Sequence, residues 1–344
     1  MAPDITVLLP VYNGEQHVAE AVRSILEQSY ANFELLIMDD GSTDGTPQVL
    51  EALAATDARV RIHRRENRGL IATLNEGLAM CSTELVARMD ADDRAMPERL
   101  ALQKAFMDAH AHIAVCGTGM EMYESGRVVT PRCGAPFDIL CLFSPPLAHP
   151  TVMYRRSVVL GMGGYASDMP AAEDYDLWCR MAAAGYGIDN LPQALLRYRM
   201  HPDAPRVGYR ATSRDTTKRI WIRQLQRLGS SPTQSDLDVH GYCATPCVDI
   251  PLRINAAKKW LRTLCERNSQ AGIYDQAALT LECANMQKAF PPPLSLLKNP
   301  CDYAVRVVRH ALAALCRGTG PVGNKLENTG RSWARHIRIF LGKG

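Results

Sequence analysis

The stretch FELLIMDDGSTDGTPQVLEALAA, residues 33–55, contains the unit that decides the fold. It begins with an apolar run, Phe33–Met38, passes through an acidic loop that contains glycine, and ends in a segment with helical spacing, Thr46–Ala55. A short apolar run followed at once by a helical period is typical of a buried strand that leads into a helix. Repetition of this unit predicts an α/β fold with a mostly parallel sheet and helices on both faces.

The same alternation extends from residue 5 to residue 119. The expected strands are Ile5–Val11, Phe33–Met38, Val60–His63, Glu84–Met89 and Ile113–Gly119. The expected helices are His17–Gln28, Thr46–Ala55, Leu70–Met80 and Pro97–His110. In sheets of this kind ligands bind beyond the carboxyl ends of the strands. Asp39-Asp40 and Asp90–Asp93 follow two of the expected strands, so we expect both clusters at one edge of the sheet.

The pattern becomes less regular after residue 120. We expect a hairpin at Glu121–Thr130, a helix at Asp174–Ala184 and a strand at Leu195–Met200. Basic helical segments follow, and they define a second region, 206–344, after a first region, 1–205. The expected helices of this second region are Ala211–Leu228, Pro251–Arg267, Ala271–Ala289 and Asp302–Arg317.

The composition is that of a globular protein, with 47% hydrophobic and 22% charged residues among 344 and a formal net charge of +3. That small net charge conceals an asymmetry, because acidic residues exceed basic ones in 1–205 and basic residues exceed acidic ones in 206–344. A basic region of this kind often meets an anionic membrane face or nucleic acid. No aromatic-interleaved basic motif accompanies it, so we expect no nucleic-acid binding.

The sequence also favours a cytoplasmic location. The apolar run Ile5–Val11 has no basic residues before it and is too short for a signal peptide, and no apolar stretch reaches 18 residues. Eleven scattered cysteines suit a reducing cytoplasm. His240, Cys243 and Cys247 are irregularly spaced and lack a fourth ligand, which argues against a zinc site.

The last segment, Arg331–Leu341, has an apolar stripe opposite an arginine face. Two interpretations remain open for it. It could lie among the headgroups of an anionic leaflet, or it could be a terminal helix packed on the domain with solvated arginines.

Paired carboxylates are the strongest chemical signal in the chain. They occur at Asp39-Asp40, at Asp90-Ala-Asp92-Asp93 and at Glu173-Asp174. Like charges held together are costly unless a cation, a base donor or a reacting hydroxyl offsets them. The three clusters together predict an enzyme that grips a nucleoside diphosphate through a divalent ion and removes a proton.

The cluster that begins at Asp90 predicts the metal site. Alternate residues that leave a strand point the same way, so Asp90 and Asp92 could both reach one Mg²⁺ or Mn²⁺ ion. An EF-hand is excluded, because its required Gly and Glu are replaced by Ala95 and Ala101. A phosphatase-type aspartate nucleophile has no supporting lysine motif, and a solvated acidic turn remains the plain alternative.

The turns after the first two strands predict a nucleobase site. Tyr12 could lie against a planar base, and the carboxylate of Asp40 could accept the N3–H of uracil. Gly41 would let the backbone approach the ligand. Taken alone these are ordinary loops, in which Thr43 or Asp44 could serve as helix N-caps.

The combination of these motifs resembles family 2 glycosyltransferases, which have the GT-A fold. The resemblance covers residues 5 to about 203 in the order of the family's motifs. The matching pieces are LLPVYNGE, MDDGSTDGT, Asn67-Arg68-Gly69 followed by Leu74-Asn75, Asp90-Ala-Asp92-Asp93, GGYASDMPAAEDYDLWCRM and YRMHPDA. The Gln/Arg-x-x-Arg-Trp signature of processive synthases is missing, which favours transfer of a single sugar.

The resemblance also implies roles for individual residues. Asp174, beside Glu173, matches the general base. Asp92 matches the metal ligand, and His201 matches a histidine that reaches the metal or the diphosphate. The residues that the resemblance assigns to the nucleotide-sugar are Pro10, Tyr12, Asn13, Glu15, Asp40, Arg68, Asp90 and Asp93.

The implied activity is inverting and depends on Mn²⁺ or Mg²⁺. The expected donor is a UDP-sugar, and the expected acceptor is a glycan or a lipid-linked saccharide in bacterial surface-glycan assembly. The basic helices would contact the inner face of the plasma membrane peripherally or form a homo-oligomer. A sugar-phosphate nucleotidyltransferase would need a Gly-rich, Arg-containing loop, which VYNGEQH is not. A non-catalytic nucleotide-sugar-binding protein would need no Asp174.

Overall fold

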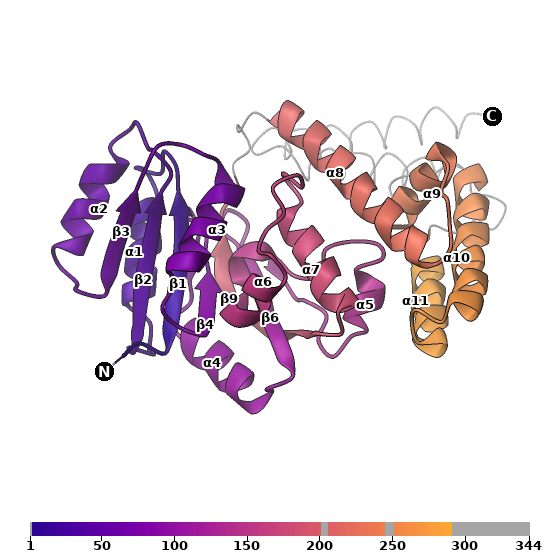
Figure 1. The fold of residues 1–344 in the computed structure, drawn as a ribbon, viewed down its shortest axis with the longest axis horizontal. Coiled ribbons are helices and arrows are strands. Elements are labelled where there is room, and N and C mark those ends of the chain that lie inside the picture. Colours follow the sequence, from indigo (N-terminus) through magenta and orange to yellow (C-terminus); the bar gives the residue numbers. More distant parts are fainter. Residues whose placement is uncertain (1, 201–205, 245–250, 291–344) are drawn as a thin grey trace, which may run out of the picture. The chain divides into compact units, whose positions relative to one another are not determined.

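The computed structural model describes residues 2–200, 206–244 and 251–290 (Figure 1). Within this part of the chain, residues 2–200 and Val207–Thr217 form one compact unit. The described residues from Lys218 onward form a second unit. His201, Cys247 and the segments 302–317 and 331–341 lie outside the described residues, so the expectations for them stay predictions.

The first unit is built on a nine-stranded sheet. Its strands are β1 (Ile5–Val11), β2 (Phe33–Asp39), β3 (Val60–Arg64), β4 (Leu85–Arg88), β5 (Arg94–Ala95), β6 (Ile113–Met122), β7 (Val128–Val129), β8 (Met153–Arg155) and β9 (Gly187–Tyr198). The strand order is β3-β2-β1-β4-β8-β6-β9-β5, and β7 pairs with β6. All five strands expected before residue 120 are present, and so is the expected hairpin, formed by β6 and β7.

The pairing is parallel only in part. β3, β2, β1 and β4 are parallel neighbours, and β6 is parallel to β9. The short strand β8 lies between β4 and β6 and is antiparallel to both. The sheet is therefore mixed, and β8 is an antiparallel strand that the sequence did not reveal. The strand expected at Leu195–Met200 is the second half of the much longer β9.

Helices cover the first unit and continue into the second. They are α1 (Val18–Leu26), α2 (Thr46–Ala54), α3 (Leu70–Met80), α4 (Arg99–Ala109), α5 (Phe137–Leu140), α6 (Arg156–Gly161), α7 (Glu173–Ala183), α8 (Arg206–Arg227), α9 (Gln234–Ala244), α10 (Pro251–Ala271) and α11 (Gln276–Ala289). A 3₁₀ turn covers His149–Thr151. The helix expected at Ala271–Ala289 begins five residues later, because Gly272 has positive φ and ends α10.

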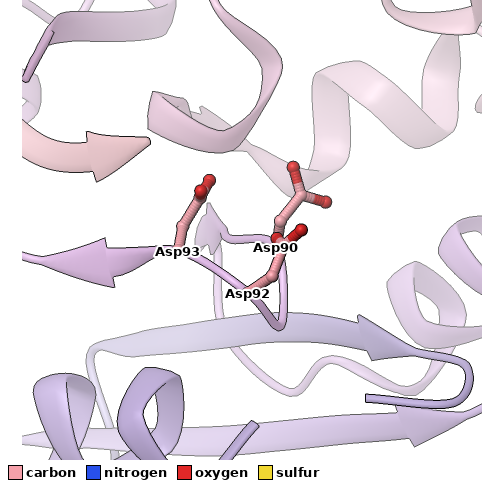
Figure 2. Close-up of side chains that lie close together, drawn as sticks. All are labelled: Asp90, Asp92 and Asp93. Carbon is pink, nitrogen blue, oxygen red and sulfur yellow. The ribbon is translucent and has the colours of Figure 1, made fainter. Parts of the chain in front are cut away.

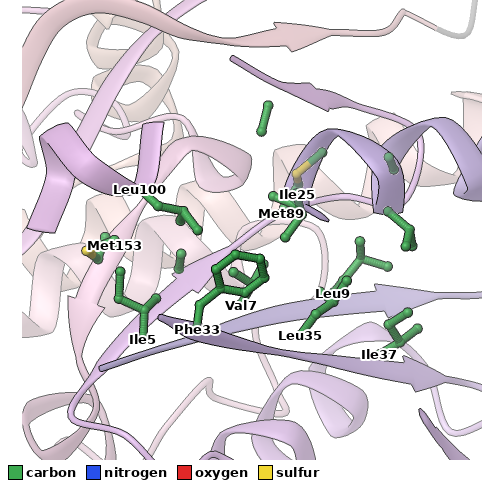
Figure 3. Packing of buried hydrophobic residues seen from close by; sticks show 14 of the residues in the cluster. Ile5, Val7, Leu9, Ile25, Phe33, Leu35, Ile37, Met89, Leu100 and Met153 are labelled. Atoms are coloured by element: carbon green, nitrogen blue, oxygen red, sulfur yellow. The ribbon is translucent and has the colours of Figure 1, made fainter. Parts of the chain in front are cut away.

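Alternation along the parallel strands explains why helices lie on both faces. Val7 and Leu35 belong to the core cluster that contains Ile25 of α1 (Figure 3). Leu8, one residue on, faces α3 and packs against Gly77. A Cβ added to Gly77 would lie only 2.4 Å from Leu8 Cδ1. Full burial of one such leucine contributes about 1.5–3 kcal/mol, so a register shift of one residue would be costly.

A buried polar network lies where the strand pairing changes from parallel to antiparallel, at β8. Arg99 is fully buried on α4, and its Nη2 donates to the carbonyl of Arg88 on β4 at 2.6 Å. Gln103, one turn later, donates to the carbonyls of Cys116 on β6 and Thr151 before β8, each at 2.9 Å. These bonds satisfy buried carbonyls on β4, on β6 and in the turn before β8. The network thereby holds β4, β6 and β8 in place.

The second unit is helical. α10 contacts both α9 and α11, and the unit buries apolar side chains such as Leu261 and Leu264. His240 is fully buried, and its Nδ1 accepts from Trp260 Nε1 at 3.0 Å, as expected of a core histidine rather than a metal ligand. The sequence did not reveal α9. No helix in the described ranges is long and apolar enough to span a bilayer.

Candidate active site

The loops that follow β1 and β2 are bonded to each other at the carboxyl edge of the sheet. Asn13, which has a positive φ of 52°, donates its backbone N–H to Ser42 Oγ at 2.9 Å, and its side-chain oxygen accepts from the Thr43 N–H at 2.8 Å. Glu15 accepts from the Gly45 N–H at 2.6 Å. Asn13 and Glu15 therefore hold the two loops together through their own hydrogen bonds.

Asp40 is almost fully buried at the end of β2. Its carboxylate accepts from the backbone N–H groups of Arg68 and Gly69, each at 2.9 Å, and from the guanidinium of Arg65. Gly41 follows with φ 77°, and a Cβ there would lie 2.6 Å from the Asn67 nitrogen. Asp40 thus holds the Asn67–Gly69 turn, a role that the sequence did not predict.

The other expected nucleotide residues in this region differ in accessibility. Tyr12 is 52% exposed, so its ring is available to a planar ligand. Pro10 is buried in β1, where pairing with β4 has already ended at Leu8, so its missing N–H breaks no bond to β4. The Arg68 side chain is exposed and lies 3.2 Å from Glu66.

The turn after β4 brings together the carboxylates of Asp90, Asp92 and Asp93, whose ligand atoms all lie within 4.8 Å of one another. Figure 2 shows the three side chains on the same side of the turn. β4 ends at Arg88, so the turn, and not strand alternation, makes the carboxylates converge. The cluster was expected, but the geometric reason given for it was wrong.

Asp93 is the most constrained of the three. Its Oδ1 accepts from the Arg199 N–H at 2.9 Å, whereas its Oδ2 is buried and has no hydrogen-bond partner among the described residues. Burial and then the charge of Asp90 raise the pKa of Asp93 to about 8. A buried oxygen without a donor, beside two more carboxylates, fits the oxygen ligand set that Mg²⁺ and Mn²⁺ prefer.

Arg88 connects this turn to the third acidic cluster. It is 2% exposed, and its Nη2 lies 2.6 Å from Asp90 Oδ1. Burial acts to lower the pKa of Arg88, but the Asp90 carboxylate outweighs that effect and raises it. Burial raises the pKa of both Glu173 and Asp174, and the positive charge of Arg88 partly opposes that rise.

Glu173 and Asp174 open α7, one residue ahead of the start expected from the sequence. Glu173 is buried, and Asp174 is partly buried with its Oδ1 accepting from the Tyr175 N–H at 2.7 Å. Burial, followed by the charge of Glu173, raises the pKa of Asp174 to about 6. A carboxylate with a pKa near neutrality is suited to general-base catalysis.

The loop before α7 is held from two sides. Asn75 on α3 exchanges two hydrogen bonds of 2.8 Å with the backbone of Tyr165. The Tyr165 hydroxyl lies 3.0 Å from His149 Nε2, and burial lowers the pKa of His149 well below its ordinary value. Trp178 packs edge-on against the same histidine and is fully buried. His149 and Trp178 thus belong to the core.

Three arginines that bond the acidic residues escaped the sequence analysis: Arg65, Arg88 and Arg199. Arg88 could have been found, because it is the lone charge inside the apolar run LVAR, and a charged residue there must be paired. Arg65 and Arg199 gave no such signal, since their partners are distant in sequence. Of the expected site residues, only His201 lies outside the described part of the chain.

Comparisons with known proteins agree with this geometry. A family model described as Glycosyl transferase family 2 matches residues 6–143. The putative glycosyltransferase EpsE of Bacillus subtilis is 37% identical over 208 residues, which span 59% of this chain and 75% of EpsE. The O-antigen biosynthesis glycosyltransferase WbnJ of Escherichia coli is 32% identical over 204 residues, which span 57% of this chain and 80% of WbnJ.

Solved structures share the fold at low identity. TarS of S. aureus, residues 1–349, has a TM-score of 0.53 at 19% identity and covers 83% of this chain and 89% of its own. A mannosyltransferase of Pyrobaculum calidifontis, solved with GDP-Man and Mn²⁺, has a TM-score of 0.53 at 21% identity, with coverage of 90% and 85%. The GT-A fold expected from the sequence is confirmed.

Proposed function

This chain belongs to glycosyltransferase family 2, and we propose that it transfers a single sugar from a UDP-sugar to a saccharide or lipid-linked acceptor. The anomeric configuration is inverted in one displacement. The observation that supports this most directly is the convergence of the Asp90, Asp92 and Asp93 carboxylates in the turn after β4. The pathway is surface-glycan assembly, in line with relatives named for O-antigen and amylovoran biosynthesis.

The donor lies across the loops after β1, β2 and β4. Tyr12 packs against the base. The buried Asp40 orients the base-facing loops, and its carboxylate accepts a hydrogen bond from the N3–H of the uracil. Pro10, Asn13, Glu15 and Arg68 complete this part of the site through the backbone and loop contacts described above. Asp90 and Asp93 orient the ribose and the sugar from the acidic turn.

Asp92, with Asp93 beside it and His201 from the chain after β9, would hold a divalent ion. When bound, Mn²⁺ or Mg²⁺ would stabilise the charge that develops on the leaving diphosphate. The fit rests on the three convergent carboxylates and on the buried, unpartnered oxygen of Asp93.

Asp174 removes the proton of the acceptor hydroxyl. The oxygen then forms a bond to the anomeric carbon as the bond to the diphosphate breaks, and the nucleoside diphosphate leaves. Burial, and then the charge of Glu173, raise the pKa of Asp174 to about 6, so the base is poised near neutral pH. Asp174 is partly exposed, which leaves it accessible to an acceptor.

The test begins with a thermal-shift screen of UDP-, GDP- and dTDP-sugars in the presence of Mn²⁺. The stabilising donor is then used to measure nucleoside diphosphate release to water, which takes the place of the acceptor hydroxyl. We expect Asp174→Asn to lower this rate by roughly 10²–10⁴-fold, the scale for loss of a general base, and to keep nucleotide affinity within several-fold.

The matched control is Asp168→Asn, which removes an exposed carboxylate of the preceding loop and should turn over at the normal rate. Full activity in Asp174→Asn would refute the assignment of the base. Tight nucleotide binding without any turnover in the unmodified protein would instead favour a non-catalytic binding protein.

The region 1–205 carries the catalytic domain and 206–344 a basic, mainly helical region that contacts the cytoplasmic face of the plasma membrane. The arginine face of residues 331–341 motivates this role. Flotation with vesicles that contain anionic lipid should carry the full chain upward more than a chain of residues 1–325. Equal partitioning of both into the aqueous phase would remove the membrane role.

A further inference from the structure

Arg199, directly after β9, contacts segments that are far apart in sequence. Its backbone N–H donates to Asp93 Oδ1 and its Nε donates to the Asp92 carbonyl, each at 2.9 Å. Its Nη2 donates to Glu20 Oε2 on α1 at 2.8 Å. One residue thus bonds both ends of the Asp92–Asp93 step and anchors it to a helix.

The guanidinium is itself held in place. Its centre lies 3.9 Å from the centroid of the Tyr123 ring, and the Tyr123 hydroxyl donates to the other oxygen of Glu20 at 2.9 Å. Arg199, Tyr123 and Glu20 therefore form a closed set of contacts, and the arginine side chain is only 15% exposed. A planar donor fixed on both its edge and its face loses little further entropy when it bonds the turn.

The acidic turn needs such support, because its carboxylates repel one another. Outside the strands, its backbone has few ladder bonds, and the Asp92 carbonyl is satisfied by Arg199. Arg88 pairs with Asp90 at the other end of the turn. The two arginines contact opposite ends of the cluster, and Arg199 acts at the end that carries Asp92.

We propose that Arg199 is a positioning residue, which holds the Asp92–Asp93 turn in the shape that receives a divalent ion and the donor diphosphate. This inference rests on the proposed function. A metal-binding side chain that must be ordered at each binding event weakens the affinity for the ion, whereas one that is already held in place does not.

The experiment measures Mn²⁺ binding to the full chain by electron paramagnetic resonance, in which the signal of free hydrated Mn²⁺ falls on binding, at saturating UDP. Arg199→Met should raise the Mn²⁺ dissociation constant about tenfold or more, equivalent to about 1.4 kcal/mol. Arg199→Lys should not restore it, because an ammonium cannot reach the Asp92 carbonyl and Glu20 in the planar arrangement of a guanidinium. Metal-free binding of uridine should stay within twofold.

Two variants serve as controls. Arg127→Met removes an exposed arginine of the β6–β7 turn and should leave Mn²⁺ affinity unchanged. Tyr123→Phe keeps the ring under the guanidinium and loses only the bond to Glu20, so its effect should be smaller than that of Arg199→Met. If Arg199→Met does not fold, Glu20→Gln carries the test, with an expected loss of about threefold.

Unchanged Mn²⁺ affinity in folded Arg199→Met, or in Glu20→Gln where that variant carries the test, would overturn the positioning role. An equal loss of uridine and Mn²⁺ binding would also overturn it, because general destabilisation would then explain both. Failure of the unmodified protein to bind Mn²⁺ with UDP would be a different result. It would remove the metal assignment itself, and this role with it.

Discussion

The pH dependence of turnover should reveal the raised pKa of Asp174. A general base must be ionised, so kcat is expected to fall as the pH falls through about 6. With that pKa, about 90% of Asp174 is ionised at pH 7 and about 10% at pH 5, so kcat should drop by nearly tenfold between the two. An aspartate with the ordinary pKa of 3.8 would remain about nine-tenths ionised at pH 5, and kcat would be almost flat.

A neighbouring variant separates the causes of the shift. Burial is the larger cause and the charge of Glu173 the next, so Glu173→Gln should move the acidic limb to lower pH without bringing it to 3.8. The charge of Arg88 acts to lower the pKa of Asp174, and Arg88 is unchanged in this variant.

The assay is nucleoside diphosphate release at saturating donor and Mn²⁺, measured from pH 5 to pH 8 in buffers of constant ionic strength. Asp168→Asn should show the same limb as the unmodified protein. A profile that stays flat down to pH 5, or a limb that survives unchanged in Asp174→Asn, would refute the reasoning.

Three further predictions concern stability and binding. Because folding raises the pKa of Asp174, its contribution to stability is full below pH 3.8 and is lost as the pH rises through about 6. Asp174→Asn should therefore raise the free energy of unfolding at pH 7.5 by at most about 3 kcal/mol, as measured by urea unfolding. The gain should become smaller as the pH falls towards 4. Asp92→Ala should abolish the gain in UDP affinity that Mn²⁺ gives and leave metal-free UDP binding intact by calorimetry; an undiminished gain would contradict the ligand assignment. Gly41→Ala should cost about 2–4 kcal/mol in unfolding free energy, since its Cβ would meet the 65–69 loop, whereas Gly134→Ala, also at positive φ but in open space, should cost about 1; equal costs would show that the contact does not matter.

The sequence predicted the elements whose signals are local. The helix Leu70–Met80 and the strand Ile5–Val11 match the structure at both ends, because each has a clear apolar period bounded by polar residues or glycine. β8 could not be predicted in the same way. It has three residues, and its antiparallel placement depends on bonds from Arg99 and Gln103 that lie far away in sequence.

The candidate site shows the same division. Carboxylates after strands were visible as motifs, so Asp40, Asp92 and Asp174 could be singled out. The contacts that these carboxylates make in the folded protein could not be predicted from the sequence. The hydrogen bonds of Asp40 to the Asn67–Gly69 turn, and the ion pair between the buried Arg88 and Asp90, arise only when the chain folds.

The claim at the centre of this account is that Asp40, Asp92 and Asp174 serve one bound donor. Crystals grown with UDP and Mn²⁺, measured for anomalous scattering from manganese, test it most directly. We expect one manganese peak in contact with Asp92 and the diphosphate, the uracil between Tyr12 and Asp40, and Asp174 facing the open side where the acceptor enters. Manganese bound away from Asp92, or UDP bound where Asp174 cannot approach the diphosphate, would contradict the account.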